Sequence, residues 1–371
     1  MTPAERPPRV LLACDWFVKY TARLGRGLAD VGCEVVLLSR DHDQEFGDEP
    51  GAMRAFAHDV LGAGPRHLML GGRVREPRRL ADTVRLRRSL RGWQPDFVHL
   101  QDSVPNDMRL AVAAGLPGRP YALTVHDPVV HPGDRVAPAW IRAVRRGLRR
   151  RADLIFVHSE ALAEELRGTG DARGAIEVVP HGLTGAAPRP LPLRPSLLFF
   201  GRISHYKGLD TLLDAMPLVW ERLPETTLTI AGEGPLPERE ALADPRVTLR
   251  HEHVPEEDVA GLFANATCAV LPYRQASQSG VGSEAKRFGR AIVATHVGGL
   301  PELVDDGCGR LVAPEDPAAL AEAVLEVAGT PGLAAELGRN AAASGDESSW
   351  PSVAARTLDA YRRVLGGRES P

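Results

Sequence analysis

The stretch SLLFFGRISHYKGLD at residues 196–210 decides the fold of the second half of this chain. Leu197 to Phe200 form an apolar run of strand length, and leucines with helical spacing begin after Gly208, so the stretch predicts a strand, a turn and a helix. Gly201 lets the backbone turn tightly, while Arg202 and Lys207 bring two cations to one strand end. Because lysine is rare in this arginine-rich chain, the pair favours a diphosphate site over a turn with solvated charges.

Short apolar runs alternate with helical segments along the whole chain. In the second half we expect further strands at Thr227 to Ala231, Val247 to Arg250, Cys268 to Leu271 and Ile292 to Thr295, with helices at Gly208 to Arg222, Glu256 to Ala264, Gly282 to Phe288 and Pro317 to Ala328. In the first half we expect strands at Arg9 to Ala13, Glu34 to Leu38, Asp96 to Leu100, Tyr121 to Val125, Asp153 to Val157 and Glu177 to Val179. The pattern predicts an α/β protein whose parallel sheets are covered by helices.

A proline-rich segment divides this pattern, since its composition suits neither a helix nor a central strand. We expect a doubly wound, Rossmann-like domain at residues 1–185, a linker at 186–196, a second such domain at 197–345 and a closing C-terminal helix at 346–371. We further expect the two domains to face each other across a cleft, with ligands bound beyond the carboxyl ends of the strands.

The composition is that of an ordinary globular protein, with 25% charged and 43% hydrophobic residues. The longest apolar runs are far shorter than a membrane-spanning helix, and the N-terminus does not resemble a secretory signal, so we expect a cytoplasmic protein. A net charge of −3 does not recruit nucleic acid. The scattered cysteines (Cys14, Cys33, Cys268 and Cys308) are expected to be reduced and structural, and no metal site is indicated.

A second loop with small residues follows the apolar run that ends at Leu271. It leads through Ser279, Gly280 and Gly282 into a helix, whose exposed N-terminal amides favour an anion and whose small side chains let a ligand approach the backbone. Glu284 lies one turn into this helix. Its carboxylate either accepts hydrogen bonds from ribose hydroxyls or caps the helix, and the residues alone leave the two alternatives even.

Together these residues resemble the retaining glycosyltransferases of family 4, which have the GT-B fold. The resemblance is strongest from Leu197 to Leu311. It rests on the Gly-Arg-x-x-x-x-Lys-Gly signature at 201–208, Ala-Gly-Glu-Gly-Pro at 231–235, the Gln-Ser-Gly loop at 278–280 with Glu284, and Val-Gly-Gly-x-Pro-Glu at 297–302. In the first half it is looser and rests on Asp-Phe-Val-His at 96–99, Thr-Val-His-Asp at 124–127, Val-His-Ser-Glu at 157–160 and Val-Pro-His-Gly at 179–182.

The resemblance implies a role for each candidate residue. Arg202 and Lys207 would hold the donor diphosphate and carry the catalysis together with His126, which would touch the transferred sugar, and Glu284 would grip the ribose. Other donor-binding residues would be Gly201, the loop Gln278, Ser279, Gly280 and Val281, and Gly232, Glu233 and Val254 beside the base.

Two positions depart from the family pattern. Ala276 stands where relatives have a glutamate that contacts the sugar, which leaves sugar selectivity open. After the first strand the chain has Cys14 to Tyr20 in place of a Gly-Gly turn, so a bulky loop shapes the acceptor pocket. Within that loop Lys19 either meets an anionic acceptor or the donor phosphate, or is an exposed lysine on a loop.

The histidines near strand ends need a separate interpretation. By itself His126, which closes the run Tyr121 to Val125, would be a structural histidine with one buried hydrogen bond, and the resemblance reverses that choice and directs it towards the cleft. His99, His158 and His181 are expected to be packing or supporting residues.

The resemblance implies a metal-independent, cofactor-independent hexosyltransferase that moves a sugar from a nucleotide diphosphate sugar to a hydroxyl of a glycan, glycolipid or small metabolite, with retention. The basic stretches Arg73 to Arg91 and Arg142 to Arg151 are either solvated helix faces, which we favour, or sites of transient contact with a membrane surface or a phosphorylated acceptor. Another GT-B enzyme, such as a sugar-nucleotide epimerase or a phosphorylase, and a non-catalytic binding module stay open as alternatives. A NAD-dependent dehydrogenase is disfavoured because Gly25 and Gly27 lie in the first helix without the rest of the fingerprint.

Overall fold

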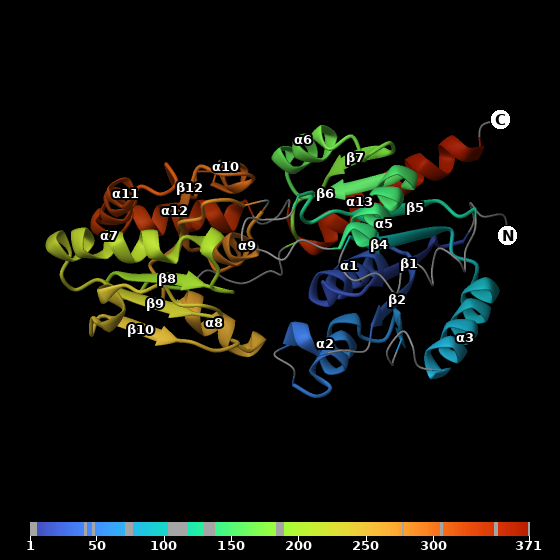
Figure 1. Ribbon diagram of the computed structural model, residues 1–371, viewed down its shortest axis with the longest axis horizontal. Helices are drawn as coiled ribbons and strands as arrows, with labels where there is room; N and C mark the ends of the chain where they lie inside the picture. Colours follow the sequence, from blue (N-terminus) through green and yellow to red (C-terminus); the bar gives the residue numbers. More distant parts are fainter. Residues whose placement is uncertain are drawn as a thin grey trace. The chain divides into compact units, whose positions relative to one another are not determined.

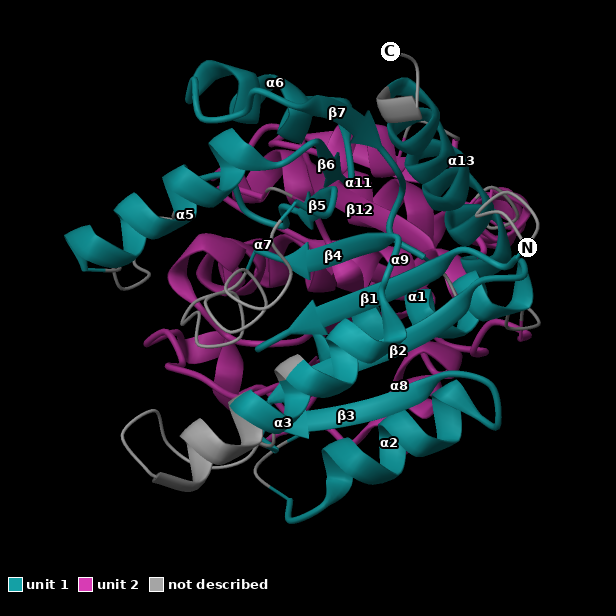
Figure 2. Cartoon of the chain, turned by 90° about the vertical axis from the view of Figure 1, so that its right-hand side faces the viewer, with its two compact units in different colours: residues 1–129, 136–182, 350–371 teal, residues 130–135, 183–349 magenta. Residues whose placement is uncertain are grey.

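The computed structural model describes residues 6–40, 43–46, 49–70, 77–102, 118–129, 138–182, 189–276, 278–304, 307–344 and 348–369. The chain divides into two compact units, drawn in different colours in Figure 2. Unit 1 takes in Met1–Val129, Val136–Gly182 and Trp350–Pro371, and unit 2 takes in Val130–Arg135 and Leu183–Ser349.

Unit 1 is built on a parallel sheet that has, within the described residues, seven strands in the order β3-β2-β1-β4-β5-β6-β7. Val10 and Leu12 of the central strand pack on one face of this sheet and Leu11 and Ala13 on the other, so the strand is apolar throughout. The strands are β1 (Arg9–Cys14), β2 (Glu34–Arg40), β3 (Arg66–Leu70), β4 (Phe97–Gln101), β5 (Tyr121–Thr124), β6 (Leu154–Val157) and β7 (Ala175–Val178).

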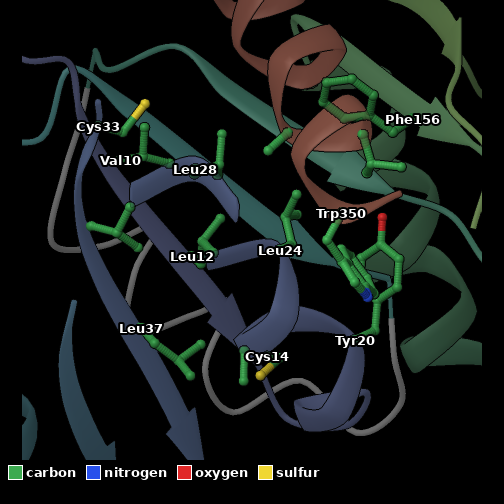
Figure 3. Close-up of a cluster of buried hydrophobic side chains, with 14 of the residues drawn as sticks. Val10, Leu12, Cys14, Tyr20, Leu24, Leu28, Cys33, Leu37, Phe156 and Trp350 are labelled. Carbon is green, nitrogen blue, oxygen red and sulfur yellow. The ribbon is translucent and has the colours of Figure 1, made fainter. Parts of the chain in front are cut away.

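The helices of unit 1 include the last one of the chain. Helix α13, red in Figure 1, packs beside α1, and a β-carbon on Gly27 of α1 would lie 2.9 Å from the carbonyl oxygen of Trp350. Figure 3 shows Trp350 next to Tyr20 of α1, with ring centroids 5.2 Å apart. Gly27 therefore serves helix packing and not a dinucleotide fingerprint. The helices are α1 (Val18–Asp30), α2 (Ala52–Leu61), α3 (Pro77–Trp93), α5 (Ala139–Arg151), α6 (Glu160–Gly168) and α13 (Trp350–Glu369), with a 3₁₀ turn η2 (Gln44–Phe46).

Unit 2 repeats the architecture with, among its described residues, six parallel strands in the order β10-β9-β8-β11-β12-β13. The strands are β8 (Ser196–Phe200), β9 (Thr227–Ala231), β10 (Val247–Arg250), β11 (Cys268–Leu271), β12 (Ala291–Thr295) and β13 (Gly309–Val312). The helices are α7 (Leu209–Arg222), α8 (Glu256–Ala264), α9 (Gly280–Arg287), α10 (Leu300–Val304), α11 (Pro317–Gly329) and α12 (Leu333–Ala343), with 3₁₀ turns η3 (His205–Lys207) and η4 (Glu240–Ala243). The prediction of two doubly wound α/β domains is confirmed.

The structure also bears on the cysteines and on the length of the apolar helices. All four cysteines are buried, and none of them forms a disulfide bond among the described residues. Within the described residues no single helix is long and apolar enough to cross a membrane. Helices α11 and α12 pass that criterion only as a pair, which is bent by 93°.

Candidate active site

The candidate residues of unit 2 gather where the strand order of its sheet reverses, between β8 and β11. Gly201, directly after β8, has a φ of +95°, and a β-carbon there would lie 3.0 Å from the Nζ of Lys207 and 3.4 Å from the Cγ2 of Val281 in α9. The structure thus brings together three residues that the sequence placed in two separate loops.

The turn after β9 packs against the backbone of the loop that follows β8. The amide of Ile203 donates to the carbonyl of Glu233 at 2.7 Å, and a β-carbon on Gly232 would lie 2.1 Å from the carbonyl oxygen of Gly201. Gly232 has a φ of +149°, so it meets both a steric and a conformational demand for glycine. The side chain of Glu233 is exposed. Contact of this turn with a base stays a prediction.

Lys207 is the buried cation of the site. Only 8% of the residue is exposed, and its Nζ lies 5.3 Å from the centroid of the Tyr273 ring. Its pKa is lowered, chiefly because burial removes the ammonium group from water; Tyr206 opposes this effect, and the positive charge of Arg202 adds to it. No carboxylate of the described residues forms an ion pair with Lys207. A buried cation in this state favours binding of an anion.

Arg274 fixes the turn that carries Lys207, a role that the sequence did not suggest. Its guanidinium group donates to the carbonyl of His205 at 2.8 Å and to both carboxylate oxygens of Asp210, each at 2.8 Å. Its backbone amide donates to the carbonyl of Tyr206 at 2.7 Å. The available signal was an arginine three residues after the end of β11, with an aspartate in the first turn of α7, but nothing in the sequence pairs them.

The loop after β11 prepares the N-terminus of α9. The hydroxyl of Ser279 accepts from the amide of Gly282 at 3.1 Å and caps the helix, while the Tyr273 hydroxyl lies 3.3 Å from it. The amides of Gly280 and Val281 lie in the first turn, where intrahelical acceptors are lacking. One expectation was wrong: a β-carbon on Gly282 would lie 2.1 Å from the Cδ2 of Leu303, so this glycine serves packing and not the approach of a ligand.

Three other donor-site candidates lie around this centre. Because Ser279 is the cap of α9, Glu284 does not cap the helix, and its carboxylate accepts from the Nη1 of Arg287 at 3.0 Å with 24% of the side chain exposed. Gln278 is half-buried. Val254 is buried in the hydrophobic cluster that includes Phe263, so little of its own side chain can contact a ligand.

His126 of unit 1 lies deeper than the sequence suggested. Its ring stacks on Phe17 at 3.8 Å between centroids, and only 2% of the residue is exposed. The Nε2 atom lies 2.8 Å from the Oε1 of Gln101, and the Nδ1 atom lies 3.3 Å from the Nε2 of His158. Both ring nitrogens therefore have a partner within unit 1, one more than the single buried hydrogen bond expected of a structural histidine at this position. Its contact with a sugar stays a prediction.

The other histidines of unit 1 support this arrangement, as expected. The Nδ1 of His158 donates to the Val179 carbonyl at 3.0 Å, and its Nε2 faces the Nδ1 of His126. Tyr20 lies 5.2 to 5.3 Å from the rings of His126, His158 and His181. Burial lowers the pKa of His158 to about 4 and that of His181 to about 3. Burial also holds the pKa of His126 well below its usual value.

The second basic stretch of the sequence, Arg142 to Arg151, lies on α5, and several of its arginines form ion pairs within unit 1. Arg149 donates to the buried Asp102 at 2.8 Å, and Arg145 lies 3.2 Å from the same carboxylate. Arg146 and Arg150 pair with Asp171. The expectation of a solvated face was therefore wrong for Arg145 and Arg149, whereas Arg146 and Arg150 are exposed as expected. The first basic stretch, Arg73 to Arg91, begins outside the described residues.

Known proteins match both halves of the chain. A family model described as Glycosyltransferase Family 4 matches residues 18–184, and one described as Glycosyl transferases group 1 matches residues 194–329. The glycogen synthase of Mycobacterium tuberculosis is 29% identical over 361 residues, which cover 92% of this chain and 82% of the relative. The D-inositol 3-phosphate glycosyltransferase of Streptomyces avermitilis is 31% identical over 245 residues, which cover 58% of this chain and 52% of the relative.

A solved structure extends the likeness to the fold. The Anabaena protein HepE in complex with UDP-glucose superposes with a TM-score of 0.70 at 16% identity, covering 95% of this chain and 99% of that protein. Since the two halves match models of one glycosyltransferase group and the whole chain has the two parallel-sheet domains of these proteins, the chain belongs to glycosyltransferase family 4 and is a glycosyltransferase of the GT-B fold.

Proposed function

We propose that the protein transfers a sugar from a nucleotide diphosphate sugar to an acceptor hydroxyl, with retention of the anomeric configuration and without a metal ion. The observation that carries the proposal is the buried Lys207 beside Gly201 and the first turn of α9. A buried cation in this position, close to the positive charge of Arg202, favours an anion that enters from outside. The diphosphate of a sugar nucleotide supplies one.

The same groups can promote the reaction. As the bond between the anomeric carbon and the phosphate oxygen breaks, negative charge grows on the diphosphate, and Lys207, Arg202 and the amides of Gly280 and Val281 stabilise it. The acceptor oxygen forms the new bond to the same face of the anomeric carbon, and its proton passes to the departing phosphate oxygen. Ala276 occupies the position of the family glutamate, so no side-chain carboxylate contributes there.

The similar proteins support a nucleotide diphosphate sugar as the donor, and their names point to more than one class of acceptor. HepE was solved with UDP-glucose, which has the diphosphate that the Lys207 site would hold. A glycogen synthase extends a glycan, whereas an inositol phosphate glycosyltransferase modifies a small metabolite. We infer that the acceptor hydroxyl of the present protein belongs to a glycan, a glycolipid or a small metabolite.

A donor panel tests the proposal. The purified chain is incubated with UDP-, ADP- and GDP-sugars, and release of the nucleoside diphosphate is followed with and without sugar acceptors and with and without EDTA. Acceptor-dependent release that EDTA leaves unchanged, with a product of the donor's anomeric configuration by NMR, is expected. An epimerase would change the donor sugar without an acceptor, a phosphorylase would require phosphate, and a binding module would show affinity without turnover.

A second measurement addresses Glu284. Its carboxylate should accept hydrogen bonds from both ribose hydroxyls, so Glu284→Gln is expected to weaken nucleoside diphosphate binding by roughly 1.5–3 kcal/mol if both bonds are lost. Calorimetry with the ribo and 2′-deoxy nucleotides is the measurement, and the penalty for the deoxy form should shrink in the variant. Glu322→Gln removes an exposed carboxylate of the same unit and serves as the control.

An undiminished deoxy penalty in Glu284→Gln would show that the ribose is held elsewhere. The carboxylate of Glu284 would then be assigned a structural role, which includes its ion pair with Arg287 along α9.

A further inference from the structure

The turn after β1 lies where the strand order of the first sheet reverses, between β1 and β4. Ligands of doubly wound sheets bind at such a point. Here Phe17 has a φ of +66°, a left-handed conformation that a bulky residue rarely adopts. The conformation places its ring on His126, at 3.8 Å between centroids and 22° between planes. The neighbouring Trp16 is 36% exposed, so two aromatic side chains line the turn.

The N-terminus of α1, the helix that follows this turn, binds the carboxylate of Glu45. One carboxylate oxygen of Glu45 accepts from the amide of Val18 at 2.7 Å, and the other accepts from the amide of Lys19 at 3.2 Å. These amides are the first two of α1, a helix of 13 residues whose N-terminus favours negative charge. The place that a phosphate group would take at this turn is therefore occupied by a carboxylate.

The segment that carries Glu45 is held at several points. The Nζ of Lys19 lies 5.0 Å from the centroid of the Phe46 ring, and Phe46 packs against Phe56 of α2 at 5.3 Å. Asp43 accepts from the amides of Gly51 and Met53 at 2.9 and 3.0 Å, which ties the start of η2 to the start of α2. Glu45 thus projects from a turn fixed on both sides, and the ammonium of Lys19 faces an aromatic ring.

We propose that unit 1 selects an uncharged acceptor and that Glu45 excludes phosphorylated ones from the turn after β1. The inference rests on the proposed function, which it deepens by naming the acceptor class. An incoming phosphate would meet a fixed carboxylate at short range in place of free amides, and such a like-charge contact costs several kcal/mol. The exposed Trp16, next to Phe17, instead offers an aromatic surface that suits the C–H face of a neutral sugar.

Anion binding tests the proposal directly. Inorganic phosphate is titrated calorimetrically into the full chain with UDP present in excess, so that the site of unit 2 is filled. The wild type is expected to show no second phosphate site, and Glu45→Ala, which opens the amides of Val18 and Lys19, is expected to gain one. Asp30→Asn, at the opposite end of α1, removes one exposed negative charge and should behave as the wild type.

Acceptor selectivity provides the second arm. Rates of UDP release are compared for glucose against glucose 6-phosphate and for myo-inositol against an inositol phosphate. The wild type should favour the neutral member of a pair about tenfold or more, and Glu45→Gln, which removes the charge and keeps an acceptor oxygen for one of the two amides, should reduce that ratio. Equal melting temperatures of Glu45→Gln and wild type would confirm that the variant is folded.

The inference is overturned if wild type binds phosphate while UDP is bound and Glu45→Ala leaves that binding unchanged, or if wild type prefers phosphorylated acceptors. Failure of the assigned nucleotide site gives a different result, since UDP would then fail to stabilise the protein at all. In that case the phosphate titration is repeated in Lys207→Ala, where the unit 2 site is disabled by substitution, and still reports on Glu45.

Discussion

Replacing Lys207 with alanine is expected to lower turnover about a hundredfold or more, because the variant loses a preorganised charge that stabilises the leaving diphosphate. Arg202→Ala should act in the same direction. The fold should survive in Lys207→Ala, since the lysine is buried without an ion pair to any described carboxylate, and its removal deprives no partner of a countercharge. Steady-state kinetics with a saturating donor and a thermal melt provide the two measurements.

A matched control separates this effect from a general loss of positive charge. Arg222 lies in the same unit in an exposed ion pair with Glu322, and Arg222→Ala should keep nearly full turnover. If Lys207→Ala and Arg202→Ala both turned over like the wild type at unchanged melting temperature, the assigned diphosphate site would be wrong.

Acidification is expected to destabilise unit 1 strongly below about pH 6.5, the ordinary pKa of histidine. Burial lowers the pKa of His99 to about 3 and that of His158 to about 4, and it lowers the pKa values of His126 and His181 in the same way. Below pH 6.5 the unfolded chain binds protons that the folded chain does not, so stability falls as the pH falls towards the folded pKa values. Each such histidine costs about 1.4 kcal/mol per pH unit in that window.

The four histidines together should therefore remove several kcal/mol by about pH 4.5, which is comparable to the whole stability of an ordinary domain. Denaturant unfolding followed by circular dichroism between pH 7.5 and 4.5 measures the slope. His99→Gln should lower the slope by about 1.4 kcal/mol per pH unit, while its amide can still bond Thr124. A slope that is flat in wild type, or unchanged in His99→Gln, would contradict buried neutral histidines.

The sequence by itself determined the parts of the protein that depend on local pattern. Central strands such as β1 and β8 are buried on both faces, so their apolar runs identified them directly. The glycine after β8 and the cations that follow it marked the candidate site, because a tight turn and a charge pair leave a signature over a few residues. The edge strands β3 and β13 and the helices α2, α10 and α12 were missed. β3 and β13 have half-exposed residues and lack a continuous apolar run, although the other two edge strands, β7 and β10, were predicted.

Only the tertiary structure decided which side chains meet. Glu45 reaches the first amides of α1, Arg274 holds the turn before Lys207, and Phe17 covers His126. The sequence pattern likewise suggested that Gly282 lets a ligand approach, whereas in the structure the side chain of Leu303 fills the space beside this glycine. Each of these contacts joins separate segments of the chain, and their side chains obey no period or spacing that a sequence displays. Their partners are fixed by the packing of whole elements, which sets distances that local propensity does not contain.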